Sequence, residues 1–202
     1  MRTEMINGIP VLYDLPVDEL EVLLISGDMS DFVVACEALS YQTGDKAFAL
    51  LKRFITDQDK YKRLYVLKTI FRYPKALQLK SFLEECLLSD DVLFVHNGLS
   101  VVGQYEIEVS EKAVLSAVLK HLSDLHYTDL YALKILSTSD ESFLNLTKVF
   151  KRSKKCGHKE VLGEILLEKY YPSYAQELFA LFSEDHFSKI RSLAERIKNE
   201  VL

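Results

Sequence analysis

The chain of 202 residues contains no tryptophan, and it has only seven glycines and four prolines. Glycine and proline are the residues that most destabilise a helix interior, so their scarcity is typical of a mostly helical chain with short turns. No apolar run approaches the roughly 20 residues that a membrane span requires. The segment Met1–Tyr13 has no basic stretch followed by an apolar core, since Glu4, Asn7 and Gly8 interrupt it. The sequence therefore predicts a cytoplasmic protein that does not enter a membrane.

Cysteine is also scarce, and its three positions, Cys36, Cys86 and Cys156, show no CxxC spacing. Cys36 and Cys86 fall on the apolar faces of expected helices, so we interpret them as buried free thiols of a reducing compartment. Hydrophobic residues make up 49% of the chain and charged residues 27%, as in ordinary globular proteins. A chain of this length buries roughly 70% of its unfolded surface, which supports one domain over residues 1–202.

The formal net charge of −5 argues against generic nucleic-acid binding, which relies on basic side chains that neutralise phosphates. The charges are segregated into alternating blocks: residues 1–45 carry one basic and nine acidic groups, and residues 46–80 carry ten basic and two acidic groups. Residues 81–111 carry seven acidic groups and no basic group, and residues 112–159 carry nine basic and four acidic groups. We expect opposite blocks to offset one another between neighbouring structural repeats and to keep the protein soluble.

Residues 59–122 contain two copies of one unit, an amphipathic helix followed by a turn and a second amphipathic helix. The apolar positions of the first copy match those of the second at shifts of 32 residues over the first helix and 36 over the second. The matched positions are Leu67, Ile70, Phe82, Leu83 and Cys86 against Leu99, Val102, Val118, Leu119 and Leu122. A period in the thirties predicts a helical solenoid, in which each helical pair buries its apolar face against its neighbours.

Local signals divide the rest of the chain into further helices. Asn7-Gly8 is a turn pair, but an isolated hairpin is marginally stable, so we expect an irregular arm up to Tyr13. Ser30 or Asp31 is placed to cap the second helix, and Thr128 to cap a shorter helix further on. The run from Lys148 to His158 is expected to hold a helix end and a loop.

The hairpin length and the recurring apolar triplets resemble HEAT-like and armadillo-like repeats over residues 30–182. The regular proline and the Asp/Arg ladder that HEAT units often show are absent. The resemblance implies an all-α, right-handed superhelix of about five helical hairpins with a concave binding face. Residues 1–29 would form an N-terminal arm and capping helix, and residues 183–202 a C-terminal capping helix.

No arrangement of residues in the sequence indicates a catalytic site, a metal site or a cofactor site. His121 and His126 flank Asp124 across an expected turn, a pattern that we interpret as a solvated turn in preference to a weak metal site. His96 replaces an apolar residue of the preceding repeat, which favours a hydrogen-bonded core histidine over a ligand. Cys156 and His158 are neighbours in sequence, and neighbours seldom have the geometry of a nucleophile and its base.

The sequence therefore predicts a non-enzymatic protein-binding module or adaptor, with a bacterial immunity-type protein as one form of it. Its partner would be another protein or peptide, and the sequence does not predict an oligomeric state. If the second helix of each hairpin lines the concave face, its polar residues would contact the partner. These positions are Arg53, Gln78, Ser81, Glu85, Ser116, Lys120, Asn145 and Lys148.

A basic patch in the sequence, Lys151, Arg152, Lys154 and Lys155, offers a second surface. It is expected either to be an exposed helix end or to steer an acidic protein partner by long-range attraction. The alternative function is that of a HEAT-like nucleic-acid-binding or DNA-repair glycosylase-type protein. That function requires a basic concave face with aromatic residues and a catalytic carboxylate.

Overall fold

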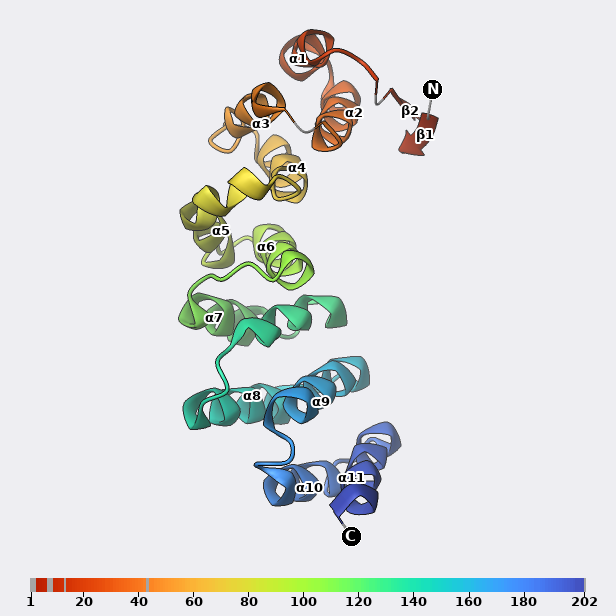
Figure 1. Ribbon diagram of the computed structural model, residues 1–202, viewed down its shortest axis with the longest axis vertical. Coiled ribbons are helices and arrows are strands. Elements are labelled where there is room, and N and C mark those ends of the chain that lie inside the picture. The colour runs from red at the N-terminus through yellow and green to blue at the C-terminus, as the bar shows by residue number, and fades with distance from the viewer. Residues whose placement is uncertain (1–2, 7–8, 13, 43, 202) are drawn as a thin grey trace. The chain divides into compact units, whose positions relative to one another are not determined.

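The computed structural model describes residues 3–6, 9–12, 14–42 and 44–201, and helices dominate these ranges (Figure 1). The predicted all-α class is confirmed except for one short hairpin at the N-terminus. Two of the helical segments, η1 and η2, have 3-10 geometry. The elements are β1 Thr3–Ile6, β2 Ile9–Leu12, α1 Val17–Ser26, α2 Met29–Ser40, α3 Asp45–Lys52, α4 Lys60–Ile70, η1 Pro74–Leu79, α5 Lys80–Leu87, α6 Val92–Tyr105, α7 Glu111–His121, η2 Tyr127–Ile135, α8 Asp140–Arg152, α9 Cys156–Tyr170, α10 Ala175–Ser183 and α11 Ser188–Val201.

The chain forms two compact units, Met1–Glu85 and Cys86–Leu202, and each is described by itself. In the first unit α2 contacts α1, α3 and α4, so it is the central helix. Its side chains from Phe32 to Cys36 are all buried, and the ring of Phe32 meets Phe54 edge-on at 5.3 Å between centroids. This core forms because α2 is apolar on nearly every face, as a helix enclosed by neighbours must be.

The N-terminal arm is a β-hairpin, so the expectation of an irregular arm was wrong. β1 and β2 pair antiparallel, with Thr3 opposite Leu12 and Ile6 opposite Ile9. β2 lies against α2, and this contact supplies the tertiary support that an isolated hairpin lacks. The turn pair Asn7-Gly8 lies outside the described residues.

The helices of the second unit lie in two rows (Figure 1). We call α6, η2, α9 and α11 the η2 row, because each of these elements contacts the next. The other row holds α7, α8 and α10. The η2 row is tightly packed at Gly103 of α6, where a Cβ atom would come within 3.0 Å of the backbone nitrogen of Ala132 in η2. Only glycine permits this approach of two backbones.

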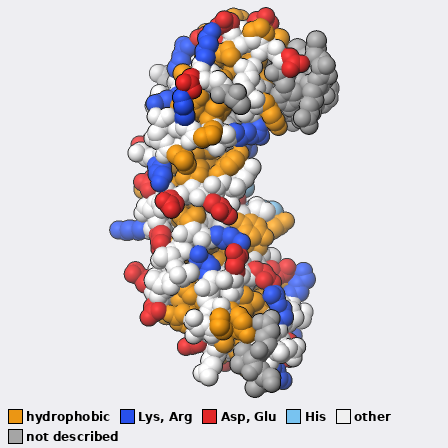
Figure 2. Space-filling model, in the orientation of Figure 1, with side chains coloured by type: hydrophobic (Ala, Val, Ile, Leu, Met, Phe, Trp, Pro, Cys, Tyr) orange, Lys and Arg blue, Asp and Glu red, His pale blue; other side chains and the backbone are white. Residues whose placement is uncertain are grey.

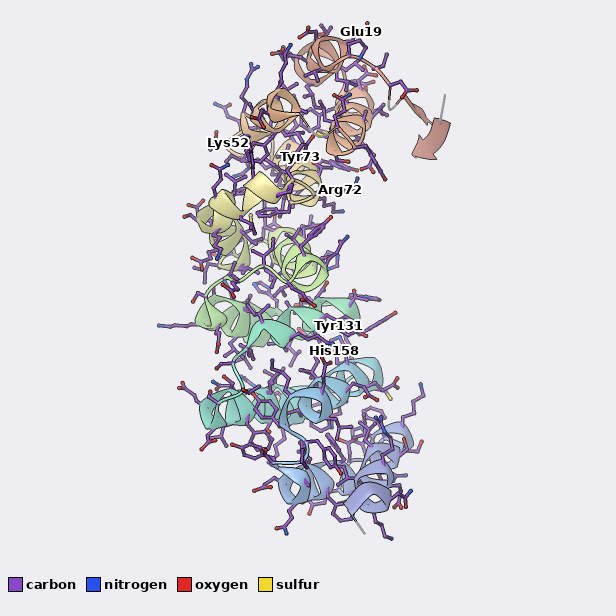
Figure 3. All side chains as sticks on the ribbon, in the orientation of Figure 1. Glu19, Lys52, Arg72, Tyr73, Tyr131 and His158 are labelled. Atoms are coloured by element: carbon purple, nitrogen blue, oxygen red, sulfur yellow. The ribbon has the colours of Figure 1, made fainter. Side chains whose placement is uncertain are left out.

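In both units, a tyrosine hydroxyl bonds to a backbone carbonyl more than 30 residues earlier in the sequence. The hydroxyl of Tyr73 donates to the carbonyl of Leu39, 34 residues earlier (Figure 3). The hydroxyl of Tyr170 donates to the carbonyl of Ser137, 33 residues earlier, over 3.0 Å. These separations are close to the shifts of 32 and 36 residues found in the sequence.

Most ion pairs also join residues about 30 apart in sequence, and those of the first unit join the acidic block 1–45 to the basic block 46–80. Figure 2 shows Lys and Arg side chains lying beside Asp and Glu side chains. Arg53 pairs with Glu21 at 2.6 Å, 32 residues away. The other pairs at such separations are Lys46–Asp18, Arg72–Glu37, Lys75–Asp45, Lys120–Asp90, Lys134–Glu168, Lys189–Glu160 and Arg196–Glu164.

Three local predictions differ from the structure. Asp28 caps α2, and Asp31 completes a capping box with it, so the helix begins before Ser30. His126, and not Thr128, caps η2. The expected loop up to His158 is short, because α9 already begins at Cys156.

Candidate functional site

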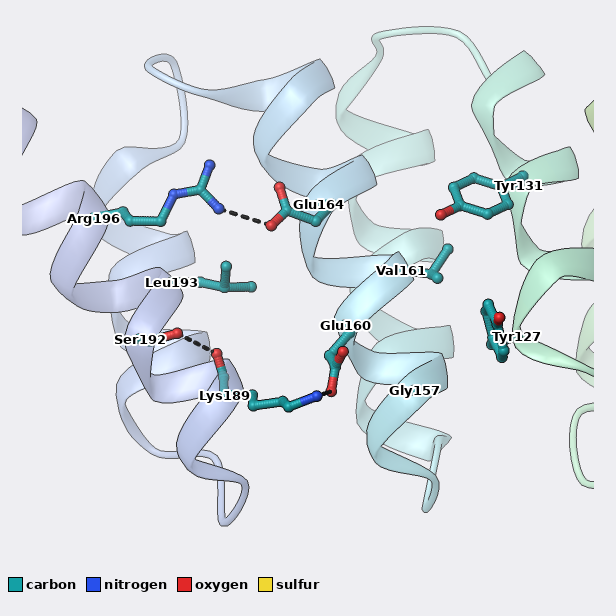
Figure 4. A pocket seen from close by; sticks show the side chains of 10 residues that line it. All are labelled: Tyr127, Tyr131, Gly157, Glu160, Val161, Glu164, Lys189, Ser192, Leu193 and Arg196. Carbon is teal, nitrogen blue, oxygen red and sulfur yellow. Dashed lines mark hydrogen bonds and ion pairs between the residues drawn. The ribbon is translucent and has the colours of Figure 1, made fainter.

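An open groove of about 630 Å³ crosses the η2 row of the second unit (Figure 4). Two tyrosines of η2 lie at one end, and the facing sides of α9 and α11 form the rest. We call it the tyrosine groove. Its lining residues are Tyr127, Tyr131, Gly157, Glu160, Val161, Glu164, Lys189, Ser192, Leu193 and Arg196. A second hollow of about 380 Å³ continues along α9 and α11, sharing Glu164 and Arg196 with it.

The two tyrosine rings are the main apolar surface of the groove. Tyr127 is 45% exposed and Tyr131 40% exposed. Tyr127 lies over α9 at Gly157, where a Cβ atom would be in ordinary van der Waals contact with Tyr127 at 3.8 Å. The ring of His126 supports Tyr127 from the other side, with 4.2 Å between centroids.

Ion pairs between α9 and α11 form the polar floor of the groove. Glu160 pairs with Lys189 at 3.0 Å, and Glu164, one turn further, pairs with Arg196 at 2.7 Å. The thiol of Cys156 also donates to Glu160 over 3.1 Å. Hydrogen bonds from Cys156 and then Lys189 hold the pKa of Glu160 below its usual value, and the bond to Glu160 raises the pKa of Lys189.

A histidine–carboxylate pair lies beside the groove in the η2 row. Nδ1 of His96 in α6 donates to Oδ2 of Asp129 over 2.7 Å, and the backbone N–H of His126 donates to the same oxygen over 2.8 Å. Asp129 is fully buried, whereas the side chain of His96 is 43% exposed. The prediction that His96 is hydrogen-bonded is confirmed, but its position in the core was wrong, because only its partner is buried.

The sequence pair Cys156 and His158 is not arranged as a nucleophile and base. The hydrogen bond to Glu160, followed by desolvation, raises the pKa of the Cys156 thiol, which disfavours the reactive thiolate. Nε2–H of His158 donates instead to the carbonyl of Leu125 over 3.1 Å. Burial, followed by the charge of Lys155, lowers the pKa of His158.

The other histidines and cysteines singled out in the sequence differ in burial. His121 is buried in the last turn of α7, so its expected place in a solvated turn was wrong, whereas His126 is exposed. Among the described side chains, no group of three or more His, Cys, Asp and Glu could hold a metal ion. Cys36 and Cys86 are buried free thiols, as expected, and burial raises the pKa of Cys36 far above its usual value.

The eight predicted contact positions lie outside the tyrosine groove. Those of the second unit lie on α7 and α8, in the row opposite η2, and those of the first unit lie at the end of α3, in η1 and in α5. Seven are exposed and Asn145 is half-buried. Arg53 and Lys120 are engaged in ion pairs with Glu21 and Asp90.

The structure does bring Lys120 together with part of the basic patch. A hollow of about 310 Å³ is lined by Leu119, Lys120, Leu122, Ser123, Arg152, Lys154, Lys155 and His158. We call it the basic hollow. Lys151, the fourth residue of the patch, is exposed but does not line it.

The tyrosine groove was not predicted from the sequence, although weak signals for it exist. Tyr127 and Tyr131 are four residues apart, as are Glu160 and Glu164, and this spacing places each pair on one helix face. The sequence contains no sign that the two faces meet. No described helix is long and apolar enough to span a membrane.

No family model and no curated protein matches this sequence. A similar solved structure is the crystal structure of an engineered protein determined by the Northeast Structural Genomics Consortium. It is 16% identical in sequence and has a TM-score of 0.51, and the match covers 91% of this chain and 96% of that chain. At this identity the likeness concerns the fold alone.

Proposed function

We propose that this chain is a cytoplasmic, non-enzymatic protein-binding module built as a single α-solenoid of HEAT-like hairpins. Contacts that recur at about one repeat support the architecture. Tyr73 to Leu39, His96 to Asp129 and Tyr170 to Ser137 span 34, 33 and 33 residues. Such contacts join each repeat to the next, which is the way a solenoid buries its core.

The tyrosine groove is the surface that best supports protein binding. Tyrosine buries a large ring while its hydroxyl stays hydrated, and it loses little conformational entropy on binding, so it is enriched at interfaces. Tyr127 and Tyr131 are together on one element, partly exposed, and beside paired charges that can exchange partners. The half-exposed tyrosine pair in an open groove is the observation that carries the proposal.

The polar positions on the second helices remain a separate proposed contact surface. Ser116, Lys120, Asn145 and Lys148 lie on α7 and α8, in the row opposite the groove. Variants on the two rows therefore distinguish which face binds. An extended partner that wraps around the repeats would need both.

Affinity capture from the native cell extract, followed by mass spectrometry, tests the function. We expect one protein to be recovered in stoichiometric amount with the natural sequence and to be lost with Tyr127→Ala/Tyr131→Ala. The matched control is Tyr61→Ala/Leu144→Ala, because these side chains are 52% and 66% exposed and lie outside the groove.

The variant Asn145→Ala/Lys148→Ala tests the opposite row in the same assay. Loss of the partner with this variant alone would move the binding surface to α7 and α8. If no protein is recovered in proportion to the bait, the protein-binding proposal is wrong. A toxin or secretion-related reading frame beside the gene would favour the immunity-type role.

The basic hollow is the observation that favours the alternative, a nucleic-acid-binding or repair protein. Lys120, Arg152, Lys154 and Lys155 gather there in an otherwise acidic chain. Recovery of nuclease-sensitive material in the capture experiment would support this alternative over a protein partner.

A further inference from the structure

The basic hollow lies where the end of α7 meets the junction between α8 and α9. It shares no lining residue with the tyrosine groove. Lys120 comes from α7, whereas Arg152, Lys154 and Lys155 come from a segment more than 30 residues later in the sequence. Four cationic side chains therefore line one hollow of about 310 Å³, and no Asp or Glu lines it.

Two side chains of the hollow are held in place by backbone carbonyls of the preceding repeat. Nζ of Lys155 donates to the carbonyls of Ser123 and Leu125 over 2.6 and 3.2 Å. Nε2–H of His158 donates to the same Leu125 carbonyl over 3.1 Å. An ammonium group has three donors, so Lys155 keeps one for a ligand while its position is fixed. Such fixing reduces the conformational entropy that binding would remove.

The other three cationic side chains of the hollow have either no partner or one exposed ion-pair partner. Within the part of the chain that the structure describes, the side chains of Arg152 and Lys154 form no hydrogen bond and no ion pair. Lys120 pairs with Asp90, whose side chain is 98% exposed and can leave this contact readily. Elsewhere, cations such as Arg53 and Arg196 are matched by carboxylates one repeat away. No carboxylate lines the hollow and Asp90 pairs with only one of its cations, so the other like charges repel one another and a bound anion would relieve that repulsion.

We infer that the basic hollow binds a compact, multiply charged phosphate anion, such as pyrophosphate or a phosphate monoester. The planar guanidinium of Arg152 matches phosphate oxygens in pairs, and the ammonium groups of Lys120, Lys154 and Lys155 supply the charge that a dianion requires. A single carboxylate would neutralise only one of these four charges. The site is independent of the protein-binding role, and either can fail without the other.

A long nucleic acid fits this place less well than a compact phosphate. Asp90 is bonded to Lys120 at one side, and Asp124 accepts from the hydroxyl of Ser123 over 3.1 Å at another. Both carboxylates would repel phosphates that continue beyond the hollow. The formal net charge of −5 also disfavours an extended polyanion.

Titration calorimetry with inorganic pyrophosphate tests the site on the full chain. We expect 1:1 binding, weakened about tenfold by Arg152→Gln/Lys154→Gln and weakened also by added NaCl. The matched control, Lys112→Gln/Lys198→Gln, removes two exposed cations outside the hollow and should bind as the natural sequence does. Circular dichroism should show equal helix content in all three proteins, because all four side chains are exposed.

Amide chemical shifts locate the bound anion in a second measurement. Pyrophosphate should move the resonances of residues 119–125 and 152–158 most. Absence of binding, equal weakening by both double variants, or shifts centred elsewhere would overturn the inference. Phosphoserine and a phosphorylated peptide, titrated in parallel, distinguish a free phosphate ester from one on a protein. Tighter binding of a single-stranded oligonucleotide, with a salt dependence that indicates many phosphate contacts, would contradict the compact-anion site.

Discussion

Tyr73 and Tyr170 perform the same task in the two units. Tyr73 follows α4 and Tyr170 ends α9, and their hydroxyls donate to carbonyls 34 and 33 residues earlier. Both side chains are buried, and desolvation raises the pKa of each phenol to about 12, with Glu111 also contributing at Tyr170. The phenol therefore stays protonated as the hydrogen-bond donor over the whole physiological range.

Removing either hydroxyl should destabilise the protein modestly. We expect Tyr73→Phe and Tyr170→Phe each to lower the free energy of unfolding by about 1 kcal/mol, because a buried carbonyl loses its donor. Urea denaturation measures this change. Tyr61→Phe is the control, since Tyr61 is 52% exposed and removing its hydroxyl leaves no buried carbonyl without a donor. An equal loss in all three variants would show that these two hydrogen bonds contribute no more to the free energy of unfolding than an exposed hydroxyl does.

Lys159 and Asp185 form a buried ion pair between α9 and the turn before α11. The ammonium group of Lys159 lies over the rings of Phe150 and Phe187, 5.0 and 5.8 Å from the ring centroids. Burial acts to raise the pKa of Asp185. The hydrogen bonds from Lys159 and from the backbone N–H of Phe187 outweigh it, so the pKa of Asp185 lies below its usual value of 3.8.

The Lys159–Asp185 pair gives the protein an acid-sensitive contribution to stability. Because the carboxyl has a lower pKa in the folded chain, this contribution is complete above the unfolded pKa of 3.8 and disappears as pH falls through the lower folded pKa. In Asp185→Asn we expect a loss of about 3–5 kcal/mol near neutral pH, because Lys159 is left buried without its counter-charge. The difference from the natural sequence should shrink in denaturation experiments below about pH 4. A constant difference down to pH 2 would contradict this account.

At the scale of single elements, helix starts depend on the choice between nearby polar side chains. α2 could begin with Ser30 or Asp31 as its cap, but the structure uses Asp28, whose side chain accepts from the N–H of Asp31 over 3.0 Å. Asp31 accepts in return from the N–H of Asp28 over 3.3 Å. This reciprocal capping box satisfies two free donors at once, which a single cap at Ser30 cannot do.

The position of this cap makes a direct prediction. Asp28→Ala should lower the free energy of unfolding by about 1 kcal/mol, because it removes the acceptor for the first turn of α2. Ser30→Ala should leave stability within about 0.5 kcal/mol, since Ser30 is exposed inside the helix. Chemical denaturation of both variants decides between the two caps. A larger loss for Ser30→Ala would return the cap to the position that the sequence favours.

The 3-10 segment η2 is closely packed against neighbouring helices. η2 lies between α6 and α9, and it approaches Gly103 so closely that a Cβ atom there would lie 3.2 Å from the carbonyl carbon of Tyr131. The sequence of η2 alone is compatible with an ordinary helix. Tyr127 and Tyr131 of η2 both line the groove, so the packing of this element decides where the tyrosine groove lies.

Across the whole molecule, ion pairs and apolar burial both join distant parts of the chain, but they contribute different amounts to stability. Many of the ion pairs have exposed side chains, for example 62% and 76% in Lys46–Asp18, whereas Arg72–Glu37 is 34% and 18% exposed. Exposed pairs contribute about 0–1 kcal/mol each. Fully buried side chains such as Phe32, Phe150 and Phe182 contribute more, so the core stabilises the fold and the ion pairs set solubility.

Salt should therefore have a limited effect on stability. Raising NaCl from about 0.05 to about 1 M screens exposed pairs almost fully, and we expect the free energy of unfolding to fall by a few kcal/mol at most. Urea titrations at the two salt concentrations measure this, and their m-values should agree because the same surface is exposed on unfolding. Unfolding of this protein in 1 M NaCl without urea would show that the ion pairs supply most of its stability.

The sequence by itself determined the helical class and most helix positions. These properties follow from signals between near neighbours: the spacing of apolar residues, the caps, and the scarcity of glycine and proline. Asp59, Asp91, Ser110 and Ser139, for instance, cap helices as the local pattern suggests. The sequence also predicts the burial of Cys36, because this residue lies on an apolar helix face.

Only the tertiary structure decided where distant residues meet. The hairpin of β1 and β2 is stable because it lies against α2, and the exposed His96 depends on the buried Asp129, 33 residues away. The tyrosine groove and the basic hollow likewise combine residues from several elements. The physical reason is that local patterns fix each helix and its apolar face, whereas the packing angles and close approaches between helices determine which polar side chains converge.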